Sequence, residues 1–154
     1  MSAPAPLRHI GCAVDFSPSS RAALHFAARL AFRDRAQLTL IHVVPIPMYY
    51  LADAFVPMSP ATGFAIHDAA RAELAKWQTE AQLDGAREVV GFVATGTASS
   101  EILRWASEHQ PDALVVGQRG HAGLEALLLG SVADRVVRSA TCPVVVVPAA
   151  AAKA

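Results

Sequence analysis

Residues 10–44 read IGCAVDFSPSSRAALHFAARLAFRDRAQLTLIHVV and combine a strand, a helix and a second strand in one unit. The runs Ile10–Asp15 and Leu38–Val44 predict strands, and their largely continuous apolar character is typical of parallel strands covered on both faces. Between them, Ser17-Pro18 predicts the start of a helix, with serine as the N-cap and proline at the first helical position. Apolar side chains then recur at spacings of three and four residues, which indicates an amphipathic helix packed on a sheet.

The rest of the chain repeats this alternation of strands and helices. Runs of β-branched and apolar residues predict three more strands, at Glu88–Thr95, Ala113–Gly117 and Pro143–Val147. Helical spacing predicts three more helices, one from about Gly63 to Leu83, one from near Ala98 until Pro111 prevents its continuation, and one after Gly130-Ser131. The alternation predicts a single α/β domain with a mostly parallel sheet and right-handed crossovers.

The segment from Pro45 to Ala61 interrupts this alternation. It contains four prolines around the apolar sequence PMYYLADAF. Proline lacks a backbone donor and is disfavoured inside helices and sheets. We therefore expect a long loop over the carboxyl edge of the sheet.

Length and composition narrow the classes of protein. The chain has 154 residues, of which 53% are hydrophobic and 17% charged, so we expect one domain with a sizeable core. Thirteen basic residues balance thirteen acidic residues, and this neutrality offers no global attraction to nucleic acid or to an anionic membrane surface. A neutral, apolar-rich protein tends to associate, so a partner surface is expected.

The cysteines and the termini predict an intracellular setting. Cys12 and Cys142 form no disulfide framework and show no CxxC spacing, and we expect both to be buried small apolar residues. The amino terminus has no signal-peptide pattern, and the longest apolar runs fall short of the roughly 20 residues that span a bilayer. We therefore expect a cytoplasmic location and no membrane partner.

Glycines follow the fourth predicted strand and precede the last predicted helix. Open doubly wound sheets bind ligands beyond the carboxyl ends of their strands. Gly117 and Gly120 flank a predicted turn there, and Gly130-Ser131 opens the helix. Glycine lets backbone amides approach a phosphate, and a helix start adds unpaired N–H groups. From these residues alone, a phosphate site and an ordinary strand–turn–helix connection remain equally open, because the chain has neither a P-loop nor a GxGxxG fingerprint.

Enzyme signatures are missing from the sequence. The six histidines show no HxH or HExxH spacing, and no cluster of His, Cys and carboxylates suggests a metal site. The serines lack a GxSxG elbow. We therefore expect no catalytic residues and no metal ligands from the protein.

The spacing Gly117-x2-Gly120-x9-Gly130-Ser131 resembles the GxxGx9G(S/T) pattern of the ATP-binding branch of the universal stress protein family. Other matching motifs are AVDFS at 13–17, GTASSEIL at 96–103 and CPVVVVP at 142–148. The resemblance covers about residues 8–148. It implies one universal stress protein domain with an open, doubly wound, five-stranded parallel sheet in the order 3-2-1-4-5 and about four helices. It also implies that ATP binds between the ends of the first and fourth strands.

The resemblance also assigns roles to single residues. It implies that Asp15 helps to fix the adenine or ribose and that Val43 or Val44 lines the adenine. The ribose and phosphates would lie against Gly117, Gly120, Gly130 and Ser131, with Arg119 inside the same loop. Each assignment has a purely structural alternative. Asp15 could serve merely to start the first helix beside Ser17, and the two valines could serve merely to pack a buried strand. Phe16 stands where many family members have glycine.

The function that follows is an ATP-binding, nucleotide-dependent sensor or switch of the stress response. Mg²⁺ would bridge the phosphates, and catalysis would amount at most to slow ATP hydrolysis. The alternative is a stress-induced protein-interaction module of the same fold that does not use ATP, and a third class is a flavodoxin-like redox or adenylyl-transfer enzyme. We also expect a homodimer through the edge strand Val144–Val147 and a protein partner that the sequence does not identify.

Overall fold

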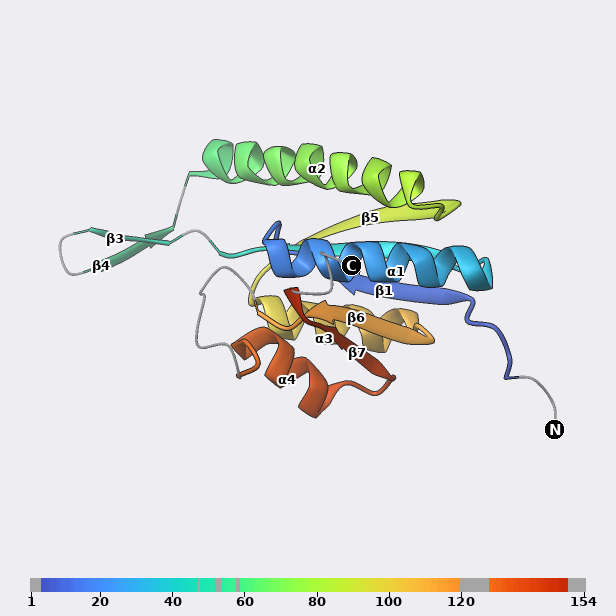
Figure 1. The fold of residues 1–154 in the computed structure, drawn as a ribbon. Helices are drawn as coiled ribbons and strands as arrows, with labels where there is room; N and C mark the ends of the chain where they lie inside the picture. The colour runs from blue at the N-terminus through green and yellow to red at the C-terminus, as the bar shows by residue number, and fades with distance from the viewer. Residues whose placement is uncertain (1–3, 47, 52–53, 58, 120–127, 150–154) are drawn as a thin grey trace.

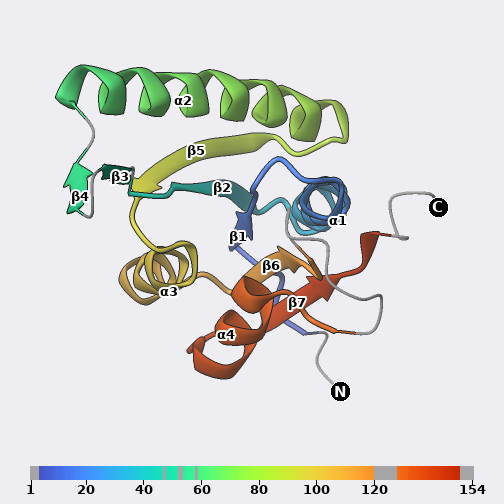
Figure 2. The same ribbon diagram turned by 90° about the vertical axis from the view of Figure 1, so that its left-hand side faces the viewer.

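The computed structural model describes residues 4–46, 48–51, 54–57, 59–119 and 128–149. Its main body is a five-stranded parallel sheet between two layers of helices (Figure 1, Figure 2). Within these described ranges, no helix is long and apolar enough to cross a membrane.

The main sheet consists of the five strands that the sequence predicts. Their bounds are β1 His9–Ala13, β2 Gln37–Val44, β5 Glu88–Thr95, β6 Ala113–Gly117 and β7 Val144–Val147. They lie in the order β5-β2-β1-β6-β7, and each neighbouring pair is parallel. Counted along the chain, these five strands have the order 3-2-1-4-5, which confirms the predicted topology and fold class.

Helices cover both faces of the sheet. One face carries α1 Pro18–Asp34 and α2 Pro60–Leu83, and the other carries α3 Ala98–His109 and α4 Ser131–Ser139. Each layer has its own buried core. Trp77 lies in the α1–α2 layer and Trp105 in the α3–α4 layer, and each is only 1% exposed. The two layers are therefore built around separate aromatic anchors.

The connections diverge between the neighbouring strands β1 and β6. After β1 the chain forms α1 and returns in β2, whereas after β6 it forms α4 and returns in β7 on the other side. These two helices cover opposite faces of the sheet. Such a switch point opens a crevice at the carboxyl ends of the two strands, where open α/β sheets bind ligands.

The start of α1 follows the sequence prediction. Ser17 is the N-cap, and its hydroxyl accepts a hydrogen bond from the Ser20 amide at 3.2 Å. Pro18 is the first helical residue, where its missing N–H leaves no intrahelical bond unmade. Both features fix where the helix begins relative to the end of β1.

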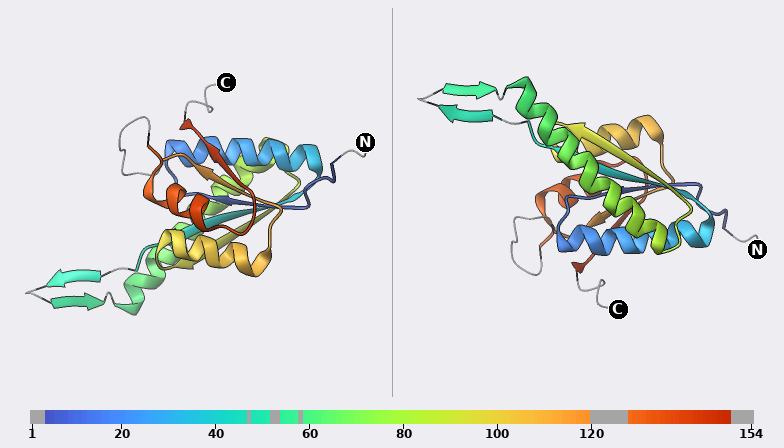
Figure 3. Two further views of the ribbon diagram at one scale, coloured as in Figure 1. Left: turned by 90° about the horizontal axis from the view of Figure 1, so that it is seen from below. Right: turned by 90° about the horizontal axis from the view of Figure 1, so that it is seen from above.

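The prediction of a long loop from Pro45 to Ala61 is wrong. Strands β3 Met48–Leu51 and β4 Ala54–Pro57 pair antiparallel in a separate two-stranded sheet, and α2 begins at Pro60 rather than near Gly63. Figure 3 shows this hairpin projecting beyond the carboxyl edge of the main sheet. The prolines misled the prediction because proline is also tolerated at strand ends and at the first position of a helix.

Three smaller expectations also need correction. The first strand ends at Ala13 rather than Asp15, because Asp15 already belongs to the turn that leads into α1. The last strand begins at Val144, after Pro143. Cys12 is fully buried as expected, and burial raises the pKa of its thiol to about 12, but Cys142 is only partly buried.

Candidate functional site

The turn after β1 is fixed to the first turn of α1. An Asp15 carboxylate oxygen, Oδ1, accepts a hydrogen bond from the Ser17 amide at 3.0 Å, and the Asp15 amide donates to the Ser20 hydroxyl at 3.2 Å. Phe16, between them, has φ 63°. Asp15 therefore does stabilise the start of the helix, and it does so at the edge of the sheet where a ligand would bind.

The aromatic ring of Phe16 fits between two other rings. It stacks on the His42 imidazole with 4.3 Å between centroids, and it meets Trp77 edge-on at 5.3 Å. A bulky residue with positive φ is uncommon, because its Cβ is crowded by the backbone. This conformation explains why glycine suits the same position, and the ring contacts explain how Phe16 is held there.

His42 supports the same turn from β2. Its Nδ1 donates to the Val14 carbonyl oxygen at 2.8 Å, which fixes the tautomer of the neutral ring. Burial lowers the pKa of His42, and this effect outweighs the opposing effects of the Val14 carbonyl and the Asp15 carboxylate. The ring that supports Phe16 is therefore uncharged at neutral pH.

The end of β6 lies directly against the start of α1. A Cβ added to Gly117 would lie 2.8 Å from the carbonyl carbon of Ser19, too close for any other residue without a shift of the backbone. Just beyond it, the Arg119 amide donates to the Ser19 hydroxyl at 3.1 Å. Ser19 thus joins the turn after β6 to the helix that follows the Asp15 turn.

The start of α4 lies at the same edge. Gly130 is its N-cap, the Gly130 amide donates to the Gln118 carbonyl oxygen at 2.8 Å, and Ser131 is the exposed first residue of the helix. No side chain in the described structure caps this helix start. The structure thus links Gly117, Arg119 and Gly130 to the turn after β1, whereas Gly120 lies outside the described residues.

The two candidate valines of β2 face opposite layers. Val43 packs with the core under α3 and α4, whereas Val44 is buried on the other face. Val44 and Thr95 form the strand ends that line a cavity of about 520 Å³ under the first half of α2. The other lining residues come from α2 and are Pro60, Gly63, Phe64, Ile66, His67, Asp68 and Arg71. No local sequence pattern indicates this cavity, because it forms between α2 and the ends of two strands that are distant in the sequence.

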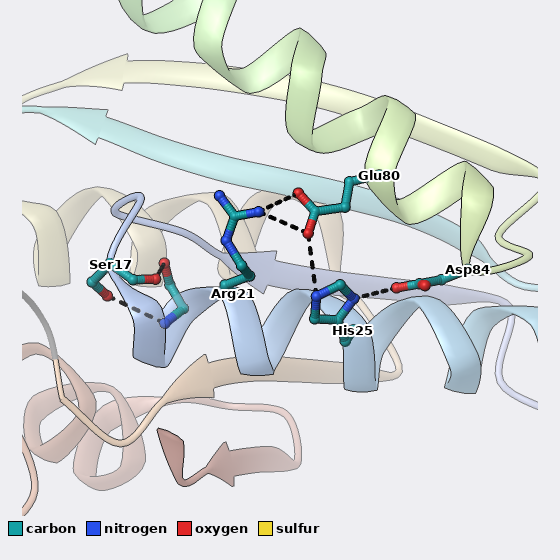
Figure 4. Close-up of polar contacts among 6 residues, drawn as sticks. Ser17, Arg21, His25, Glu80 and Asp84 are labelled. Atoms are coloured by element: carbon teal, nitrogen blue, oxygen red, sulfur yellow. Dashed lines mark hydrogen bonds and ion pairs between the residues drawn. The ribbon is translucent and has the colours of Figure 1, made fainter. Parts of the chain in front are cut away.

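A network of polar side chains joins α1 to α2 (Figure 4). Arg21 donates to both carboxylate oxygens of Glu80, at 2.7 and 2.8 Å. His25 has Nε2 3.2 Å from Glu80 and Nδ1 against Asp84. The Arg21 guanidinium also lies over the Trp77 ring, 4.6 Å from its centroid. In the described part of the chain, no group of three or more His, Cys, Asp and Glu residues is arranged to hold a metal ion.

The fold is that of an open, doubly wound α/β domain, and two of its helices, α1 and α4, start at the same edge of the sheet. The model of the universal stress protein family matches residues 6–148, so the chain belongs to this family. It is 30% identical over 141 residues to universal stress protein A homolog 1 of Coxiella burnetii, covering 91% of this chain and 95% of the relative. It is 33% identical over 148 residues to universal stress protein YxiE of Bacillus subtilis, covering 88% and 95%.

Solved structures of similar proteins share the fold. Universal stress protein UspA from Lactobacillus plantarum superposes with a TM-score of 0.76 at 26% identity, covering 94% of this chain and 99% of that one. A universal stress protein solved in complex with cAMP superposes with a TM-score of 0.67 at 25% identity, covering 94% and 98%. The second of these proteins therefore binds an adenine nucleotide.

Proposed function

We propose that this chain binds an adenine nucleotide, ATP with Mg²⁺ in its active form, and acts as a nucleotide-dependent switch in the stress response. The observation that carries the proposal is the start of α4, which no side chain of the described residues caps and which lies at the switch point between β1 and β6. The cAMP complex of a similar protein supports the ligand class. The cytoplasmic location and the unidentified protein partner expected from the sequence are parts of the same proposal.

The phosphates would bind at the start of α4. Unpaired N–H groups and the positive end of the helix dipole attract anions without a basic patch, which suits a chain of zero net charge. The hydroxyl of Ser131 adds a donor at the first helical position. Gly117 keeps the turn after β6 close to α1, and Arg119 follows it at the same edge.

The base and ribose would lie toward β1 and β2. Asp15 stands at the end of β1 with one carboxylate oxygen in the turn, and Val44 forms one wall of the cavity under α2. Val43 faces the other layer, so the geometry favours Val44 for contact with a ligand on the α2 side. Mg²⁺ usually keeps several waters and binds chiefly through nucleotide phosphates, so it would need few protein ligands here.

The proposal is tested by nucleotide titration of the purified protein. We expect wild type to bind Mg-ATP by calorimetry and to gain thermal stability with it. Gly130→Leu should weaken binding at least tenfold, because the new side chain would stand at the helix start, whereas Ser139→Leu, at the exposed last residue of α4, should bind like wild type. If millimolar Mg-ATP neither binds nor shifts the melting temperature of wild type, the nucleotide proposal fails and the interaction module that uses no ATP takes its place.

A further inference from the structure

Phe16 belongs to two parts of the molecule at once. Its backbone forms the centre of the Asp15–Ser17 turn, with φ 63°. Its ring leaves this turn and inserts between His42 of β2 and Trp77 of α2. The Phe16 side chain therefore brings the turn and helix α2 into contact, although they lie far apart in the sequence.

The backbone of Phe16 depends on those ring contacts. A bulky residue avoids the left-handed region, and such conformations persist only where the surroundings fix them. Here the surroundings are rigid, because His42 is hydrogen-bonded to Val14 and Trp77 is 1% exposed. If the ring left its place, the turn would be free to return to an ordinary backbone conformation.

Trp77 connects the Phe16 ring to the rest of α2. The Arg21 guanidinium covers the indole ring and holds both oxygens of Glu80, one turn further along α2. Glu80 in turn contacts His25, which also contacts Asp84 at the end of the helix (Figure 4). These contacts fix the second half of α2 to α1, so a shift of the Phe16 ring would act on the indole and on the segment around it.

We propose that Phe16 is a positioning residue that couples occupancy of the nucleotide site to helix α2. The inference rests on the proposed nucleotide function and adds the element that responds. A nucleotide held by the Asp15–Ser17 turn favours the seated position of the Phe16 ring between His42 and Trp77. The seated ring stabilises α2, which forms the outer surface of one layer and is available to a partner.

The test is hydrogen–deuterium exchange of peptides from α2, residues 70–83, with and without saturating Mg-ATP. In wild type we expect the nucleotide to slow exchange at least threefold. Phe16→Gly keeps the positive φ accessible but removes the ring, so it should bind Mg-ATP about tenfold more weakly and show no change in α2 at saturation. Phe16→Tyr should restore both properties, and Leu83→Ala, at an exposed site on the same helix that does not line the cavity, should behave like wild type.

A second variant changes Trp77, the other partner in the contact with Phe16. Trp77→Leu removes the other partner of the ring contact and keeps every residue of the turn, so it tests the coupling independently of Phe16→Gly. It should also abolish the response of α2, and the double variant should bind no more weakly than the weaker single variant, because both changes remove one contact.

The outcomes separate the two proposals. If wild type binds no adenine nucleotide, both the proposed function and the coupling are overturned. If wild type binds Mg-ATP but exchange in α2 does not change, or if Phe16→Gly responds as wild type does, only the coupling is overturned.

Discussion

At the residue scale, His9 and His42 lie in different surroundings, but the pKa of each is lowered. His9 lies beside Trp105 and hydrogen-bonds Thr39, and His42 lies under Phe16. Burial lowers the pKa of each, and for His9 the nearby His109 adds to the effect. Both side chains therefore resist protonation in the folded protein more than in the unfolded chain.

This difference predicts that the protein loses stability as the pH falls. Below an unfolded pKa of about 6.5, the unfolded chain binds protons at His9 and His42 that the folded protein does not, so the free energy of unfolding decreases from pH 7.5 to 5. Urea denaturation across this range measures the slope, and His42→Asn should reduce it. A flat profile would contradict the prediction.

Asp112 acts in a different range of pH. Its carboxylate accepts hydrogen bonds from the amides of Arg8 and His9, chiefly that of His9, and they lower its pKa below the ordinary value. The stabilisation it gives is present above pH 4 and is lost only as the pH falls further. Asp112 therefore does not contribute to the change in the free energy of unfolding that the two histidines cause between pH 7.5 and 5.

Gly117 and Gly63 provide a matched pair of substitutions. An added methyl group at Gly117 would collide with the backbone of Ser19, so Gly117→Ala should destabilise the protein by about 1–3 kcal/mol. Gly63 lies within α2 with nothing within 4 Å of an added Cβ, so Gly63→Ala should stabilise it by about 0.5–1 kcal/mol. Chemical denaturation of the two variants checks the opposite signs, and equal effects would refute the assignment of close packing.

At the scale of elements, local patterns predicted most of the fold but not its long-range pairs. The strands and the start of α1 follow from apolar runs and from Ser17-Pro18, because these signals are local. The contact between Arg21 and Glu80 joins residues 59 positions apart, and no spacing rule connects them. A parallel sheet places Asp15 and Gly117 at the same edge, but only the family resemblance implied that their two strands are neighbours. No local pattern indicated that Phe16 contacts Trp77.

The α1–α2 network should contribute modestly to stability. Arg21 and Glu80 are partly exposed, so their ion pair gains at most about 1 kcal/mol, but Glu80 also meets His25. We expect Glu80→Ala to lower the free energy of unfolding by about 1 kcal/mol and to lose part of this effect at high salt. Glu108→Ala, which removes an exposed pair with Arg104 on α3, should stay within about 0.5 kcal/mol of wild type. Equal losses in the two variants would contradict a special role for the network.

At the scale of the whole molecule, β7 leaves one edge of the sheet open. Among the residues that the structure describes, it pairs only with β6, on the side where the Pro143 and Val147 carbonyls accept hydrogen bonds. Because the backbone of a strand alternates, Val144 and Val146 direct their N–H groups to the open side. A second copy could extend the sheet there, which is the homodimer that we propose.

A single proline tests this assembly. Val146→Pro removes an outward donor without removing a bond to β6, so it should convert a dimer into a monomer, whereas Val146→Thr should remain a dimer. Sedimentation equilibrium at micromolar concentration distinguishes the two states. A monomeric wild type would exclude the proposed interface.

The placement of the tryptophans has a practical consequence. The chain has only two, and one lies in each helical layer. Trp105→Phe leaves an emission signal from the α1–α2 side alone, and Trp77→Phe leaves one from the α3–α4 side. The protein therefore carries its own pair of optical reporters, and comparing them shows which side of the sheet senses an added compound without any attached dye.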